Sequence, residues 1–80
     1  MEYRSLSPEE RVQIVDGRLK QLEAEHYTTA LNRRSLESAT DMTPEDQSRL
    51  LAESDEKLET LERAIEIHRR ERAELDGAGE

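Results

Sequence analysis

The chain has 80 residues, a formal net charge of −8 and charged side chains at 40% of its positions. This length allows one domain, and the interleaving of acidic and basic residues is typical of solvated helix faces. A binding site for phosphates would need a patch of one sign, so the acidic balance argues against nucleic acids and anionic membranes as partners. The absence of cysteine excludes disulfides and thiolate sites.

Secretion and membrane insertion find no support in the sequence. The residues after Met1 include no apolar run of the kind found in signal peptides. The longest uninterrupted apolar stretch, Leu50 to Ala52, is far too short to span a bilayer. We therefore expect a cytoplasmic protein. Arginine greatly outnumbers lysine, which favours a high-GC bacterium or one of its phages as the source.

The first expected element is a helix over about residues 8–38, and its start carries a full set of N-terminal signals. Ser7 can accept a hydrogen bond from the free amides of the first turn, and Pro8 loses nothing there by its missing N–H. Glu10, three residues after the cap, can reach back as a capping box. Residues 1–7 then form an N-terminal extension.

The same signals recur as Thr-Pro-Glu-Asp from Thr43, which predicts a second helix over about residues 44–76. Residues 39–43 must form the turn, because a proline disfavours a helical conformation at the residue before it. Gly77 can take the left-handed conformation that ends a helix, so the second helix should stop just before it. Residues 77–80 should then be a frayed tail.

Apolar side chains recur along both helices in alternating steps of three and four residues, which is the spacing of a coiled-coil seam. Two such seams and a short connection predict an all-α antiparallel hairpin over residues 8–76, with Leu22 near Leu61 and Leu19 near Ile65. The seam positions are Val12, Val15, Leu19, Leu22, His26, Thr29, Arg33 and Leu36 in the first helix, and Leu51, Ser54, Leu58, Leu61, Ile65, His68, Arg72 and Leu75 in the second.

Gly17 disagrees with the pattern of the first helix, because a glycine inside a helix costs about 1 kcal/mol relative to alanine. One interpretation, which we favour, is a tolerated glycine on a long helix. The other is a kink, or a close approach of the second helix near Ile65.

The seam alone is too thin for a stable hairpin, since burial of about ten aliphatic side chains recovers only a fraction of the chain entropy lost on folding. Five further apolar residues outside it predict a second apolar stripe that meets another copy, as a four-helix bundle or larger helical oligomer, most simply a dimer. Scattered surface apolar residues, which are common, are the alternative. The five residues are Ile14, Tyr27, Leu31, Leu50 and Ile67.

Two further patterns suggest ligands. Glu23 and His26 form a Glu-x-x-His pair, which di-metal four-helix proteins use, with an acid of the second helix opposite; a histidine at the edge of the seam is the alternative. Arginines could form an anion site if several copies brought them together, or simply pair with carboxylates of their own helix. These arginines are Arg33, Arg34, Arg69, Arg70 and Arg72.

Catalysis has little basis in this sequence. There is no cysteine, no visible base for a serine nucleophile and no glycine-rich phosphate loop. We therefore expect a non-enzymatic, self-associating protein–protein interaction module without a cofactor, which binds itself and another protein. The alternative function is a small helical oligomer that sequesters an anionic metabolite or nucleotide.

Overall fold

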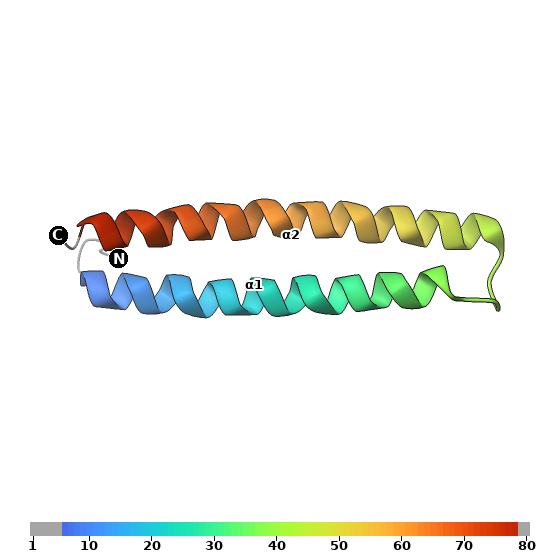
Figure 1. The fold of residues 1–80 in the computed structure, drawn as a ribbon, viewed down its shortest axis with the longest axis horizontal. Helices are drawn as coiled ribbons and strands as arrows, with labels where there is room; N and C mark the ends of the chain where they lie inside the picture. Colours follow the sequence, from blue (N-terminus) through green and yellow to red (C-terminus); the bar gives the residue numbers. More distant parts are fainter. Residues whose placement is uncertain (1–5, 79–80) are drawn as a thin grey trace.

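The computed structural model describes residues 6–78, which form two long α-helices lying side by side in opposite directions (Figure 1). Helix α1 comprises Pro8–Glu37 and helix α2 comprises Pro44–Ala78, and the described part contains no strand. The molecule measures 54 × 26 × 14 Å, so its length is essentially that of one helix. The predicted all-α antiparallel hairpin is confirmed.

Both helices begin at their predicted caps. The Glu10 N–H donates to Ser7 Oγ at 3.2 Å and the Ser7 N–H donates to Glu10 Oε1 at 3.0 Å, which completes the capping box. The bond from the Ser7 N–H is the main reason that the pKa of the Glu10 carboxyl is lowered. At the start of α2, the Asp46 N–H donates to Thr43 Oγ1 at 3.1 Å. The side chain of Asp46 is one carbon shorter than that of Glu10, and its carboxylate pairs with Arg49.

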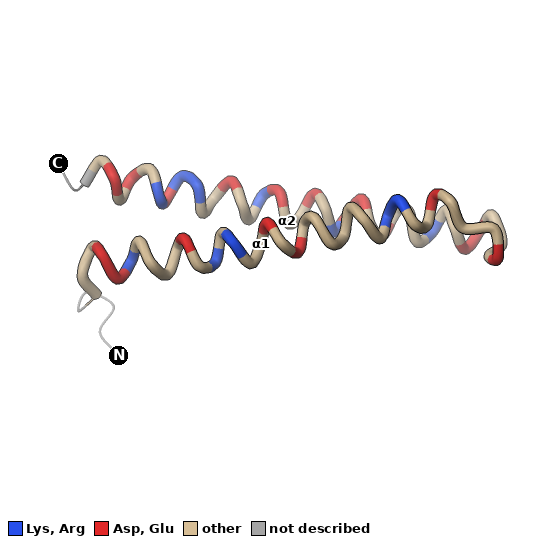
Figure 2. Tube along the Cα trace, turned by 60° about the horizontal axis from the view of Figure 1, so that its bottom comes forward, with Lys and Arg blue, Asp and Glu red and all other residues tan. Residues whose placement is uncertain are grey.

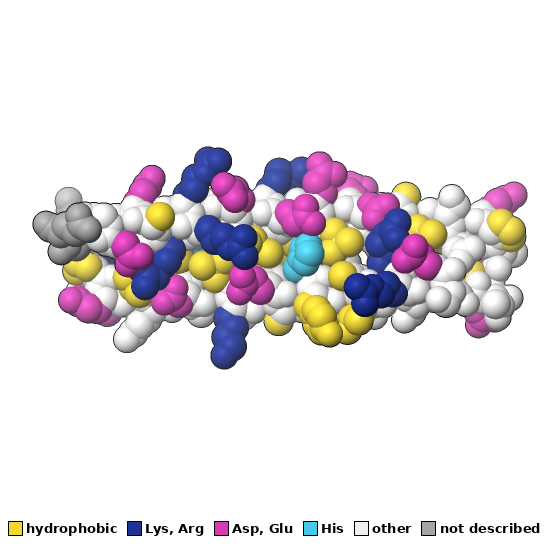
Figure 3. Space-filling model, in the orientation of Figure 1, with side chains coloured by type: hydrophobic (Ala, Val, Ile, Leu, Met, Phe, Trp, Pro, Cys, Tyr) yellow, Lys and Arg dark blue, Asp and Glu magenta, His cyan; other side chains and the backbone are white. Residues whose placement is uncertain are grey.

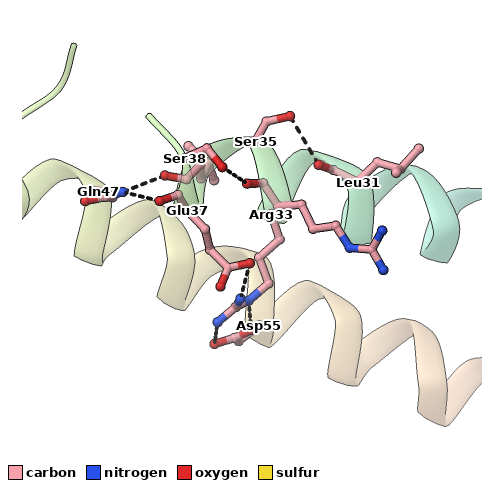
Figure 4. A network of polar contacts seen from close by, with 9 residues as sticks. Leu31, Arg33, Ser35, Glu37, Ser38, Gln47 and Asp55 are labelled. Carbon is pink, nitrogen blue, oxygen red and sulfur yellow. Dashed lines mark hydrogen bonds and ion pairs between the residues drawn. The ribbon is translucent and has the colours of Figure 1, made fainter. Parts of the chain in front are cut away.

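The C-terminal end of α1 is held by a side chain of the other helix. The Gln47 amide nitrogen donates to the Leu36 carbonyl at 2.6 Å and to the Glu37 carbonyl at 3.3 Å (Figure 4). Carbonyls in the last turn have no partner within their own helix, so Gln47 supplies one across the turn. Helix α1 ends at Glu37, one residue earlier than predicted, and the Ser38 hydroxyl bonds to the Arg34 carbonyl.

The end of α2 differs from the prediction. The helix continues through Gly77 to Ala78, and no glycine in the described residues has a positive φ. The expectation that Gly77 ends the helix in a left-handed conformation is therefore wrong, because glycine can also continue a helix at its last turn. Residues 79–80 of the predicted tail and residues 1–5 of the predicted extension lie outside the described part.

The core is the predicted seam, since every seam position in both helices is buried or half-buried. Leu22, Leu61 and Ile65 form its centre, with Leu19 packed against them as the spacing predicted. The buried hydrophobic residues of the described part are Val15, Leu22, Leu61 and Ile65, and none of its side chains is completely enclosed. Each apolar group of a two-helix seam keeps one side toward solvent, so the core is thin.

Gly17 makes no close contact in this fold. A methyl group added at its Cα would meet nothing within 4 Å outside its local helix backbone. Helix α1 runs unbroken through Gly17, so there is no break in the helix at this position. The open space also shows that α2 does not come close enough to require a glycine. The interpretation of Gly17 as a tolerated helix glycine agrees with the structure.

Candidate interaction surfaces

Side-chain pairs between the two helices form one row along the hairpin, on a single side of the seam. Figure 3 shows this side, where acidic and basic side chains and a histidine lie over the groove between the helices. We call it the charged flank. It consists of Asp16, Glu23, His26 and Arg33 from α1 and Arg72, Arg69, Glu62 and Asp55 from α2.

The first two pairs lie toward the ends of the chain. Arg72 Nε donates to Asp16 Oδ1 at 2.9 Å, and Arg69 donates to Glu23 Oε2 at 2.9 Å. Arg72 also pairs with Asp76 on its own helix, and the pKa of its guanidinium is raised first by Asp76 and then by Asp16. Apart from the half-buried Arg72, the members of these pairs are exposed, so each pair contributes little to stability by itself.

The other two pairs lie toward the turn. His26 Nε2 lies 3.0 Å from Glu62 Oε2, and Arg33 contacts both carboxylate oxygens of Asp55, at 2.5 and 3.3 Å (Figure 4). The hydrogen bond from Arg33 holds the pKa of the Asp55 carboxyl below its usual value. Arg33 also pairs with Glu37 at 3.2 Å, which fixes its guanidinium between the two helices.

The order of charges on this flank is the same in both helices. Along α1 the acidic members precede the basic ones, and along α2 Asp55 and Glu62 likewise precede Arg69 and Arg72. Both signs are visible along each helix in Figure 2. Antiparallel helices therefore place the acidic half of each against the basic half of the other, whereas parallel helices would oppose like charges. The charged flank thus favours the antiparallel arrangement.

The two residues of the predicted metal pair have separate partners. His26 is bound to Glu62, and Glu23 is bound to Arg69, so they do not converge on a common point within one chain. Among the described residues, no group of three or more potential ligands is placed to hold a metal ion. His26 is half-buried at its seam position, and its ring pairs with Glu62 across the two helices.

Four of the five arginines proposed for an anion site are paired with carboxylates of the same chain. Arg33 and Arg72 each contact acids on both helices, Arg69 contacts Glu23, and Arg70 contacts Glu66 at 3.5 Å. Arg33 lies toward the turn and the other three toward the open end, so one hairpin does not bring them together. Arg33, Arg70 and Arg72 each pair with a carboxylate four residues away on their own helix, as the alternative expected, whereas Arg69 pairs with Glu23 of the other helix.

The five residues of the predicted oligomer interface lie outside the buried seam, as expected. Four are exposed, and the fifth, Leu50, is half-buried and lines the same shallow hollow near the turn as Leu36. The exposed fractions are 58% for Ile14, 66% for Tyr27, 41% for Leu31 and 63% for Ile67.

The exposed four do not lie on one face. At about 100° per residue, Ile14 and Ile67 are directed to the side opposite the charged flank, each two residues after a seam position. Tyr27 and Leu31, four residues apart, share the outer face of α1. The single stripe expected from the sequence is therefore two separate apolar surfaces.

Comparison with known proteins gives no match to a family model, a curated protein or a solved structure. Neither described helix has an apolar stretch long enough to cross a membrane.

Two features of these surfaces were missed in the sequence. The charged flank could have been found from two sets of positions: charged or ionisable residues in the seam itself, and charged residues one position after a seam residue. The first set is His26, Arg33 and Arg72, and the second is Asp16, Glu23, Asp55, Glu62 and Arg69. The signal for Gln47 was weaker. Its side-chain amide is an uncharged donor in the first turn of α2, and the short connection places that turn close to the last carbonyls of α1.

Proposed function

We propose that the chain is a non-enzymatic protein–protein interaction module, a helical hairpin that associates with itself and presents its charged outer faces to a protein partner. One observation carries the proposal: in the part of the chain that the structure describes, the exposed large hydrophobic residues equal the buried ones in number. A hairpin that leaves so much of its apolar surface in water gains by covering it.

The thinness of the core supports self-association as the means of covering this surface. The buried centre is confined to a few side chains near the middle of the hairpin, and polar seam positions such as Thr29 and Ser54 extend it only weakly. A domain of this size normally needs disulfides, a metal or association with another chain to be stable. The chain has no cysteine, so association is the simplest of the three.

The outer faces suit contact with a protein more than with a small molecule. Glu59–Arg63 and Glu66–Arg70 pair along the outer side of α2 at 3.0 and 3.5 Å, which leaves a mixed surface of both signs. Mixed surfaces of this kind give specificity and orientation in protein contacts and provide no concentrated charge for an anion.

The proposal is tested by the mass of the protein in solution. Sedimentation equilibrium between about 1 and 500 µM should give a mass that rises to at least twice the 9.3 kDa of one chain. A mass of one chain at every concentration, with helical circular dichroism, would exclude self-association. A partner would then be sought with the monomeric hairpin.

A further inference from the structure

We propose that two copies pair through the outer face of α1, antiparallel and related by a twofold axis, with Tyr27 of each against Leu31 of the other. This inference rests on the proposed function and names the surface that carries it. We call the surface the outer stripe. It consists of Gly17, Lys20, Ala24, Tyr27, Leu31, Arg34 and Ser38.

The outer stripe has the spacing of a second coiled-coil seam. Its members follow each other in alternating steps of three and four residues, as the members of the buried seam do, and all of them are exposed. Its centre is apolar and consists of Ala24, Tyr27 and Leu31, with the long cationic side chains of Lys20 and Arg34 on either side of it. Figure 3 shows hydrophobic side chains gathered on the α1 side of the molecule, outside the groove.

Charge identifies the occupant as a second copy of the same helix. When Tyr27 lies opposite the other copy's Leu31, antiparallel pairing sets Lys20 beside Glu37 of that copy and Arg34 beside its Glu23. The twofold axis repeats both pairs, so four contacts between opposite charges surround the apolar centre. The same register brings Glu23 near Glu37 of the other copy, and Arg34 and Lys20 set a cation beside each of these two carboxylates.

The ion pairs within one chain are compatible with these contacts between copies. The described ion pairs use most of the arginines of the hairpin, but they involve neither Lys20 nor Arg34. Glu23 and Glu37 already accept from Arg69 and Arg33, and a carboxylate has further acceptor sites for a second cation.

The direction of the outer stripe determines the shape of the dimer. The stripe lies nearly opposite the buried seam on α1, because its positions are turned by roughly 150° from the seam. Two hairpins joined there form a layer of four helices in the order α2, α1, α1 and α2. The compact four-helix bundle expected from the sequence would instead need the side of the hairpin that carries Ile14 and Ile67.

The apolar centre is tested with the double variant Tyr27→Glu, Leu31→Glu and the matched double variant Ile14→Glu, Ile67→Glu. The first should sediment as one chain at concentrations where the wild type is a dimer, and the second should keep the mass of the wild type. Both replace exposed residues, and circular dichroism checks that both remain helical.

The register is tested by reversing charges. Lys20→Glu alone and Glu37→Lys alone should each weaken dimerisation about tenfold, because each change opposes like charges at two places. The combined variant should recover most of the affinity. Since Glu37 also pairs with Arg33, hairpin stability is measured for each variant in parallel.

The outcomes separate this inference from the proposed function. A wild type that is monomeric at every concentration overturns both. A dimer that survives the Tyr27 and Leu31 changes, or is broken by the Ile14 and Ile67 changes, overturns the outer stripe alone and leaves self-association standing. Failure of the combined charge variant to recover affinity overturns the antiparallel register.

Discussion

Arg33 and Asp55 join the two helices by a two-point contact, in which the guanidinium Nε and an Nη nitrogen reach the two carboxylate oxygens. Arg33 occupies a seam position, where an aliphatic residue would pack better, and its charged end turns out onto the charged flank. The aliphatic part of the side chain stays in the seam while the guanidinium binds Asp55. Arg33 therefore contributes both to the packing of the seam and to the charge pairing that favours antiparallel helices.

We predict that the Asp55 carboxyl titrates below its usual range and that Arg33→Gln raises its pKa. A carboxylate whose pKa is lowered by folding stabilises the fold above the pKa of the unfolded chain, near 3.9 for aspartate. That contribution is lost as the pH falls through the lower, folded pKa. Carbon-detected NMR titration of the carboxyl between about pH 2 and 6 measures the shift.

The control for this prediction is Arg49→Gln, which removes an arginine whose partner lies on its own helix. It should leave the Asp55 titration unchanged. If Asp55 titrates at its usual pKa in the wild type, the contact with Arg33 does not persist in solution.

Gln47 is expected to stabilise the hairpin through its bonds to the last carbonyls of α1. Gln47→Ala should lower the free energy of unfolding by about 1 kcal/mol, because two carbonyls lose a partly buried donor. Gln47→Glu should also lower the stability, because it removes the donor and brings a carboxylate close to the carbonyls of Leu36 and Glu37. Urea denaturation measures both.

The exposed neighbour Ser48 provides the matched position for these variants. Ser48→Ala should change the stability by less than about 0.5 kcal/mol, because it removes no contact with α1. Equal effects at positions 47 and 48 would mean that the Gln47 contact contributes nothing.

Gly17→Ala should raise the stability of the hairpin. The site is helical and exposed and has open space for a methyl group, so the change removes the helix penalty of glycine without a clash. The expected gain is about 1 kcal/mol, seen as a higher midpoint in thermal or urea denaturation. A loss of stability at a concentration where the hairpin is monomeric would mean that another part of the same chain approaches this position.

The fold could be predicted because the signals for it are local and repeated. Ser7 and Thr43 cap the starts of the two helices, as their sequence signals predicted. The residues at three-four spacing are the ones that are buried or half-buried. Gly77 was misjudged because a glycine near a chain end can either continue a helix or end it, and the sequence around it does not decide between the two.

The surfaces were harder to predict, since spacing along a helix identifies a face only after the buried face is fixed. Ile14 and Tyr27 both fall outside the seam in sequence, but only the orientation of α1 shows that they lie on different sides of it. The partners of Glu23 and His26 likewise depend on the register of the two helices. A shift of one helix along the other by a few residues would give each of them a different partner.

Leu22→Ala should cause the largest loss of stability among these variants, because Leu22 is 3% exposed at the centre of the seam. Removing a buried leucine side chain costs about 2 to 5 kcal/mol, a large part of the stability of a hairpin with few buried residues. If folding and association are coupled, the unfolding midpoint of this variant should rise with protein concentration. Thermal denaturation at about 5 and 500 µM measures both effects. Ile67→Ala, which truncates an exposed side chain, should change the midpoint little, and an equal loss in the two variants would contradict the placement of the core.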